Sequence, residues 1–278
     1  MIFGLITAVS AVAAAVYTIY NSSFAGFDFL WPMLAGFAAC FLGLTLIAFL
    51  FLLAVCQFVD LDKPQQKDSK FFRTIMYPYI EALMKIVGIR LTTEGLGKIP
   101  QDGRFLLVCN HQNEADPGVL LHCFPKSQLA FISKKEARNM FVVGKFMHKT
   151  LCQMIDREND REALKTILKC IQMIKEDQVS VGAFPEGGIL GDYKLYHFRS
   201  GLFKIAQKAN VPIVVCTIKG TTDLFRNIKR LKPTDVSVHL LDVIPAEDLK
   251  GKTTVEIGNR VYEMMVADLG EDWRIAEE

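Results

Sequence analysis

The chain has 278 residues, of which 51% are hydrophobic and 22% are charged, and its formal net charge is +2. This composition excludes intrinsic disorder, a collagen-like fibre and a disulfide-rich secreted module, and the near-zero net charge argues against nucleic-acid binding. Charge is unevenly distributed, because residues 1–59 contain one charged residue, Asp28, whereas residues 60–278 carry all 32 Lys and Arg. The chain therefore divides into an apolar amino-terminal part and a polar part long enough for one domain.

Two uncharged runs lie in the apolar part. The run from Ile2 to Tyr20 has about the length of one helical membrane crossing, and a longer run lies between Asp28 and Asp60. Pro32 fits the first turn of the second helix. A cleaved signal peptide is the alternative for the first run, but it lacks basic residues before it and has a second run behind it. We therefore expect a transmembrane helical hairpin over residues 1–59.

Basic residues indicate the orientation of this hairpin. Segment 21–28 contains no Lys or Arg, whereas Lys63, Lys67, Lys70 and Arg73 follow the second run. Because Lys and Arg are enriched on the cytoplasmic side, we expect an integral membrane protein whose two termini, and with them the polar domain, lie on the cytoplasmic face. The short chain and minimal anchor fit a bacterial inner membrane. The four basic residues are also expected to attract anionic lipid head groups.

Residues 60–90 form a juxtamembrane region with an amphipathic stretch. From Phe72 to Val87, apolar residues recur at i, i+3, i+4 and i+7, which predicts a helix. Pro78 should kink this helix and Gly88 can end it. Two interpretations stay open: an interfacial helix that holds the domain on the bilayer, or a helix packed on the domain core.

Residues 91–278 alternate apolar, β-rich segments with helical patterns. Several predicted strands are apolar throughout, as expected for a sheet covered on both faces. Helices are predicted after the cap at Asn159, over 201–209 and over 255–269. We therefore predict an α/β fold, a central, mostly buried sheet flanked by helices and preceded by the transmembrane hairpin. The predicted strands are 105–109, 129–132, 179–184, 211–218 and 236–243.

The sequence lacks the motifs of three other protein classes. It contains no G-x-x-x-x-G-K-[ST] nucleotide-binding loop, no G-x-S-x-G elbow of a serine hydrolase and no H-E-x-x-H of a zinc protease. The seven cysteines include no C-x-x-C pair, which indicates free thiols in a reducing compartment and neither a disulfide framework nor a metal site.

The first candidate site directly follows the predicted strand 105–109. His111 lies in a polar loop at the end of this strand, where α/β active sites usually lie. Asp116 and Pro117 are expected to be the N-cap and first residue of the next helix. If the loop turns back, Asp116 can hold one imidazole nitrogen and leave the other free as a base. The alternative is that His111 is an ordinary loop residue and Asp116 only a cap.

Two further segments contain candidate binding residues. In Phe184-Pro185-Glu186-Gly187-Gly188, a carboxylate followed by two glycines lets a ligand approach the backbone closely, although a plain turn is the alternative. Arg157 ends a short apolar run and is either a surface residue or a bidentate phosphate ligand.

Together these segments resemble the glycerolipid acyltransferase family, typified by 1-acyl-glycerol-3-phosphate acyltransferase. The resemblance spans residues 72–250 and rests on four motifs in order: Asn-His-x-x-x-x-Asp at 110–116, an apolar run that ends in Arg157, Phe-Pro-Glu-Gly at 184–187, and Val-Pro-Ile at 211–213. It implies that residues 91–278 form an acyltransferase catalytic domain.

The resemblance also implies roles for individual residues. His111 would be the general base on the acceptor hydroxyl, and Asp116 would orient it. Arg157 would bind the phosphate of the acceptor, and Glu186 and Gly187 would shape the glycerol-phosphate site.

The sequence departs from the family pattern at two motifs. The third commonly continues Thr-Arg-Ser but reads Gly-Ile-Leu at 188–190, so a phosphate-binding Arg is missing, and the second commonly opens with Gly, where Leu151 stands. Residues that could replace the lost charge are Lys194, His197, Arg199 and Lys204.

The resemblance implies an enzyme, a 1-acylglycerol-3-phosphate O-acyltransferase of phospholipid biosynthesis. An acyl group would pass from acyl-CoA or acyl-ACP, as co-substrate, to the free hydroxyl of lysophosphatidic acid, making phosphatidic acid without a metal or bound cofactor. Membrane lipids, lysophosphatidic acid and acyl-CoA or acyl carrier protein are the expected partners. The alternatives are an acyltransferase for glycerol-3-phosphate or another lysophospholipid, and a catalytically silent membrane-bound lipid-binding protein.

Overall fold

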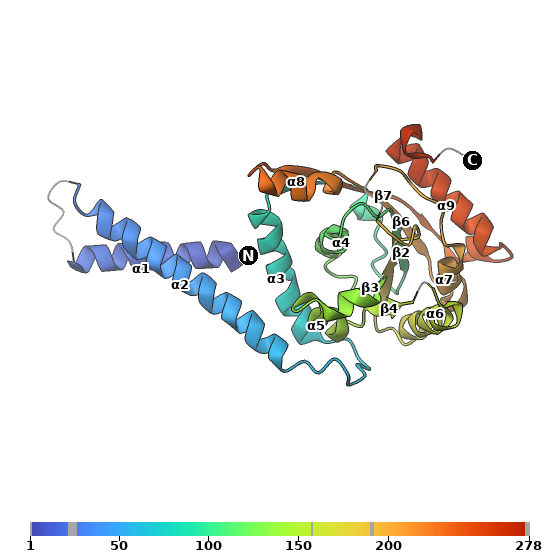
Figure 1. The fold of residues 1–278 in the computed structure, drawn as a ribbon, viewed down its shortest axis with the longest axis horizontal. Helices are drawn as coiled ribbons and strands as arrows, with labels where there is room; N and C mark the ends of the chain where they lie inside the picture. Colours follow the sequence, from blue (N-terminus) through green and yellow to red (C-terminus); the bar gives the residue numbers. More distant parts are fainter. Residues whose placement is uncertain (1, 22–26, 157, 190–191, 276–278) are drawn as a thin grey trace. The chain divides into compact units, whose positions relative to one another are not determined.

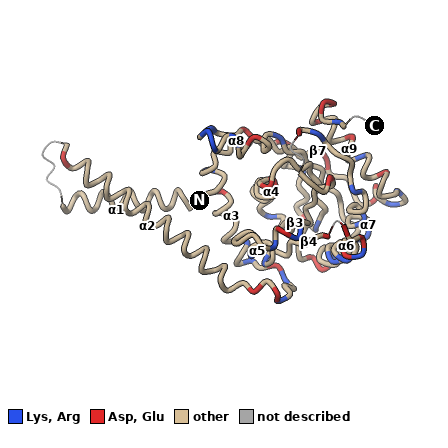
Figure 2. The backbone as a smooth tube through the Cα atoms, in the orientation of Figure 1, with Lys and Arg blue, Asp and Glu red and all other residues tan. Residues whose placement is uncertain are grey.

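A computed structural model describes residues 2–21, 27–156, 158–189 and 192–275 of the chain (Figure 1). The chain divides into two compact units, Met1–Lys63 and Pro64–Glu278. Figure 2 shows almost no charged residues along the two helices of the first unit, whereas Lys, Arg, Asp and Glu are spread over the second. This division follows the contrast in charge along the sequence.

The first unit is a pair of apolar helices, α1 (Ile2–Asn21) and α2 (Leu30–Gln57). Both are long and apolar enough to cross a membrane by length and composition. α1 buries small side chains against α2, and a Cβ on Gly36 of α2 would lie 3.8 Å from Ala14 Cα, so small residues let the two backbones approach closely. The pair agrees with the expected membrane anchor.

The second unit is built on a seven-stranded sheet with the order β1-β7-β6-β2-β5-β3-β4. Neighbouring strands are parallel except β6 and β7. The carboxyl ends of β2 to β6 therefore meet at one edge of the sheet, where ligands usually bind in such folds. The strands are β1 (Ile89–Glu94), β2 (Leu106–Cys109), β3 (Leu129–Lys134), β4 (Gln153–Ile155), β5 (Ser180–Ala183), β6 (Ile213–Lys219) and β7 (Thr234–Ile244).

Helices cover both faces of this sheet. Alternate residues of β2 point to opposite faces, so Leu106 packs in one apolar cluster with α6, α7 and α9, and Leu107 packs in another with α4. Figure 1 shows α3 and α4 on one side of the sheet and α6, α7 and α9 on the other. The predicted α/β fold is confirmed. The helices are α3 (Lys70–Ile86), α4 (Asp116–Cys123), α5 (Val143–Lys149), α6 (Asp160–Lys175), α7 (Lys204–Ala209), α8 (Leu224–Lys229) and α9 (Thr254–Leu269).

The amphipathic stretch forms α3, which packs on the domain through a buried arginine. Arg73 Nε lies 2.9 Å from both carboxylate oxygens of Asp68, and its other nitrogens donate to Leu129 O at 2.7 Å and Thr150 O at 3.1 Å. These bonds satisfy most of the guanidinium donors inside the protein. The expectation that Arg73 attracts lipid head groups is therefore wrong. Gly88 follows the helix with φ +72°, as the predicted ending requires.

Candidate active site

The candidate site begins where β2 ends, at Cys109. Asn110 is completely buried, donates Nδ2 to Ile218 O at 2.9 Å and accepts from Ile218 N at 2.8 Å. This side chain therefore pairs with the backbone of β6 as a strand residue would. It fixes the start of the 110–117 loop at the carboxyl edge of the sheet.

The loop turns back and brings His111 to Asp116. His111 Nδ1 lies 2.9 Å from Asp116 Oδ2, and the same oxygen accepts from Gln112 N at 2.7 Å and Asn113 N at 2.8 Å. The Asp116 side chain is completely buried, and these donors stabilise its negative charge. α4 starts at Asp116 with Ala115 as N-cap. The predicted N-cap role of Asp116 is wrong, because its carboxylate points back into the loop.

The surroundings of the imidazole favour a defined orientation. If Nδ1 donates to Asp116, Nε2 is the ring nitrogen able to take a proton. Across the part of the chain that the structure describes, no hydrogen bond to Nε2 is found. The imidazole ring stacks on Phe184 with centroids 3.9 Å apart, and Phe184 stacks on Phe131 at 5.6 Å. A Cβ on Gly182 would lie 2.5 Å from the Phe131 ring, so this stack depends on glycine there.

Glu186 joins the loop after β5 to the loop of the histidine. Its Oε1 accepts from His111 N at 2.7 Å and its Oε2 accepts from Tyr196 N at 3.2 Å. Burial raises the pKa of this carboxyl to about 7. Three of the predicted site residues, His111, Asp116 and Glu186, are thus brought together. The carboxylate of Glu186 is directed at backbone N–H groups of the protein, so it positions the two loops.

Gly187 allows an arginine to lie against the third motif. Its φ is +77°, and a Cβ there would lie 2.6 Å from Arg199 Nε. The backbone of Arg199 also donates to Pro185 O at 2.9 Å. Lys194, by contrast, donates to Asp272 O at 2.6 Å. Of the four candidate cations, Arg199 is the one with a described contact to this motif.

Two observations concern the second motif. Leu151 has φ +62° and is buried, and a left-handed conformation costs a non-glycine residue about 1–2 kcal/mol. This explains why glycine suits that position in the family. Arg157, the predicted phosphate ligand, lies outside the described residues, as does position 190.

Several residues of the site could not be predicted from the sequence. Phe131 and Tyr196 carry no local signal, because each meets the site through pairing or packing of segments distant in sequence. A second His–Asp pair, His239 with Asp268, was also missed, since its members are 29 residues apart on β7 and α9. Among the residues that the structure describes, no group of three or more His, Cys, Asp or Glu suits a metal ion.

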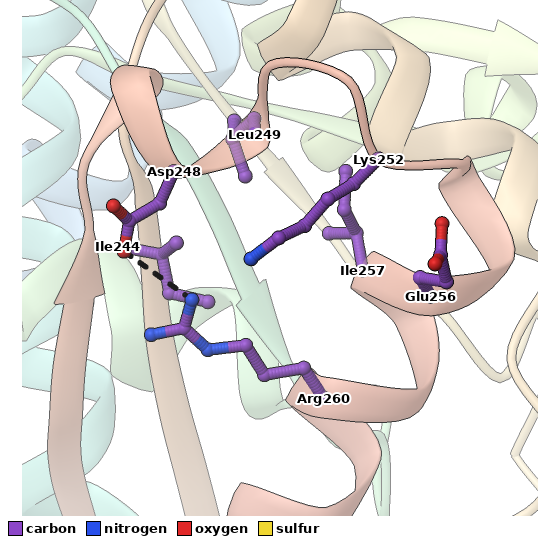
Figure 3. Close-up of a pocket in the computed structure, with 7 residues that line it drawn as sticks. All are labelled: Ile244, Asp248, Leu249, Lys252, Glu256, Ile257 and Arg260. Carbon is purple, nitrogen blue, oxygen red and sulfur yellow. Dashed lines mark hydrogen bonds and ion pairs between the residues drawn. The ribbon is translucent and has the colours of Figure 1, made fainter.

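A hollow of about 220 Å³ lies away from the candidate site (Figure 3). Ile244 lines it and pairs with Ile213 at the amino end of β6, so the hollow lies at the opposite edge of the sheet from His111. Asp248 and Arg260 form an ion pair there at 3.3 Å. Its two acidic and two basic side chains balance, so the hollow presents no net charge to a ligand.

Comparisons with known proteins agree with the geometry. Residues 90–219 match the acyltransferase family. A probable 1-acyl-sn-glycerol-3-phosphate acyltransferase of Mycoplasma pneumoniae is 30% identical over 58% of this chain and 61% of its own length. The 1-acyl-sn-glycerol-3-phosphate acyltransferase of Saccharomyces cerevisiae is 27% identical over 73% of this chain and 65% of its own length. The chain thus covers less than two thirds of these relatives.

A solved structure shows the same fold. The crystal structure of the 1-acyl-sn-glycerophosphate (LPA) acyltransferase PlsC from Thermotoga maritima aligns with a TM-score of 0.62 and 20% identity, covering 98% of this chain and 100% of that one. The resemblance found in the motifs is confirmed, because residues 90–219 match the acyltransferase family model and the relatives named above match the chain.

Proposed function

We propose that this protein transfers an acyl group from acyl-CoA or acyl-ACP to the free hydroxyl of lysophosphatidic acid, making phosphatidic acid. The observation that carries the proposal is the His111–Asp116 pair, held at 2.9 Å at the carboxyl edge of the sheet. Relatives that bear the name 1-acyl-sn-glycerol-3-phosphate acyltransferase support the choice of acceptor.

The pair can activate a hydroxyl that is a poor nucleophile near neutral pH. Asp116 holds the proton on Nδ1, and Nε2 of His111 takes the proton of the hydroxyl as its oxygen attacks the thioester carbonyl. The tetrahedral intermediate then collapses and the thiolate leaves, so no acyl-enzyme forms. General-base assistance typically contributes ~10²–10⁴-fold to the rate, and holding both substrates in place contributes further. The step requires neither a metal nor a bound cofactor.

Arg199 is our candidate for binding the acceptor phosphate, a role that the sequence resemblance also gives to Arg157. Its guanidinium lies against Gly187, in the motif that holds Glu186 on the His111 backbone. Because a charge-assisted hydrogen bond contributes about 1.5–3 kcal/mol, Arg199→Gln should raise the KM for lysophosphatidic acid about tenfold or more. The KM for the acyl donor should change little. Lys194→Gln is the matched control, and equal effects of the two variants would remove Arg199 from this role.

The proposed substrates explain the apolar amino-terminal helices. Lysophosphatidic and phosphatidic acids are held in membranes, so an integral membrane enzyme meets them without extracting them into water. The distribution of Lys and Arg favours a catalytic domain on the cytoplasmic face, and a bacterial inner membrane is the compartment we propose.

The test uses the purified full chain in detergent with labelled acyl-CoA or acyl-ACP and a panel of acceptors. We expect transfer to lysophosphatidic acid. Preference for glycerol-3-phosphate or another lysophospholipid would replace the proposed acceptor but keep the reaction. Absence of transfer from either donor to any acceptor would overturn the proposal and favour a silent lipid-binding protein.

A further inference from the structure

Part of the apolar surface of α3 is exposed to solvent. Phe72 and Met76 are buried against the domain, but Phe71, Leu83 and Ile86 are 55%, 59% and 67% exposed. Together with half-buried apolar neighbours, they continue the apolar face of the helix into solvent. Exposed apolar patches of this kind mark contacts with a protein or a membrane.

A second set of exposed apolar side chains lies in α8 and in the turn that follows it. Phe225 is 54% exposed, and Leu231 is 95% exposed with φ +52°. The turn is nevertheless ordered, because Leu231 N donates to Ile228 O and Lys232 N donates to Asn227 O, both at 3.0 Å. The turn therefore presents a leucine to solvent in a fixed, left-handed conformation.

The two groups adjoin within the second unit. Thr234 N donates to Gly88 O at 2.9 Å, and a Cβ on Gly88 would lie 3.3 Å from Pro233 Cα. The turn after α8 thus lies beside the carboxyl end of α3, as Figure 1 shows. We define the docking surface as the exposed apolar residues of these segments: Phe71, Leu83, Ile86, Phe225 and Leu231.

Positive charge surrounds the α8 part of the docking surface. Residues 223–232 include four basic residues and one acidic residue, Asp223, which pairs with Arg226 at 2.6 Å. Figure 2 shows the basic residues gathered at the end of α8. The exposed cations besides Arg226 are Lys229, Arg230 and Lys232.

We propose that the docking surface binds a bilayer that carries anionic head groups. Apolar side chains would enter the boundary between head groups and acyl chains, and the adjacent cations would bind lipid phosphates. The two membrane-competent helices of the same chain favour a bilayer over a second protein as the occupant. The inference concerns binding, so it does not depend on the proposed acyl transfer.

The test places a single tryptophan on the docking surface of the full chain. Trp31→Phe and Trp273→Phe remove both native tryptophans, and Leu231→Trp introduces the probe. In vesicles that contain phosphatidylglycerol and brominated lipids, we expect a blue shift and quenching of this probe. Val255→Trp in the same background is the matched control, because Val255 is 55% exposed at the start of α9, across the domain from α8 and near Lys252.

Charge reversal tests the role of the cations. Lys229→Glu, Arg230→Glu and Lys232→Glu together should abolish the quenching of the probe while the protein stays inserted and folded by circular dichroism. Purely phosphatidylcholine vesicles or high salt should have a similar effect. Equal quenching at positions 231 and 255, or quenching that is insensitive to charge and salt, would overturn the proposal.

Discussion

The second unit contains two histidine–aspartate pairs with almost the same geometry. His111 Nδ1 lies 2.9 Å from Asp116 Oδ2, and His239 Nδ1 lies 3.0 Å from Asp268 Oδ1. By distance alone, either pair could be assigned to general-base catalysis. The surroundings of the two pairs differ, and this difference is what supports a catalytic role for His111.

The His239 pair is partly exposed and has other charged and polar groups beside it. His239 Nε2 lies 3.8 Å from a Glu94 carboxylate oxygen, and Asp268 accepts from the Thr217 hydroxyl at 2.6 Å. Burial raises the pKa of Asp268, but hydrogen bonds from His239 and Thr217 and the charge of Lys219 outweigh it and lower the pKa overall. The second nitrogen of His239 therefore faces a carboxylate, whereas that of His111 has no described partner. Whether such a pair can act as a base therefore depends on whether its second nitrogen is free to meet a substrate hydroxyl.

The largest effect is expected from removing the charge of each aspartate in turn. Asp116→Asn should lower kcat/KM by roughly 10²–10⁴-fold, because the imidazole loses the group that fixes its tautomer and stabilises its positive form. Asp268→Asn should leave kcat/KM close to the wild-type value. Steady-state kinetics with lysophosphatidic acid checks both, and an equal loss in the two variants would erase the distinction between the pairs.

Glu186 gives the surroundings of the His111 pair a pH dependence of stability that is opposite in sign to that expected from Asp268, whose pKa is lowered. The pKa of Glu186 is raised from 4.5 to about 7 in the folded protein, so the folded state binds its proton more tightly than the unfolded state. Wild-type stability should therefore fall by about 3 kcal/mol as pH rises from about 4.5 to about 7. Glu186→Gln should lack this component of the pH dependence.

Thermal unfolding in detergent at pH 5 and pH 8 measures the effect. Glu94→Gln is the control, because the Glu94 side chain beside His239 is 79% exposed. A wild-type pH dependence that Glu186→Gln leaves intact would show that this carboxyl is not the group with the raised pKa.

The smallest effect is expected at Thr217, which is buried and donates to Asp268. Thr217→Val keeps the shape of the side chain and removes one hydrogen bond, so stability should fall by about 1 kcal/mol while kcat/KM is retained. Thermal unfolding and kinetics of the same preparation separate the two quantities. A large loss of activity would assign the His239 pair to the reaction.

Much of the fold could be predicted from local patterns. Five apolar segments matched β2, β3, β5, β6 and β7, and Asn159 caps α6 as expected. β1 and β4 could not be predicted, because Ile89–Glu94 is mostly polar and mostly exposed and Gln153–Ile155 is a three-residue edge strand. Such strands are defined by their partners rather than by their own sequence.

The candidate site was predictable to the extent that its residues are close in sequence. His111 and Asp116 meet within one loop, so their spacing and polarity indicated a site. The bond from His111 N to Glu186 depends on the pairing of β2 with β5, and the pair of His239 with Asp268 depends on the packing of α9. No local pattern contains that information.

We propose that His111, and not His239, provides the base for acyl transfer. The most direct measurement is kcat/KM for transfer to lysophosphatidic acid by the wild-type, His111→Ala and His239→Ala proteins, with folding verified by circular dichroism. We predict that His111→Ala loses at least about 10²-fold and that His239→Ala stays close to wild type. Wild-type activity in His111→Ala would show that His111 is not the base, and an equal loss in both variants would show that the two histidines do not differ in this role.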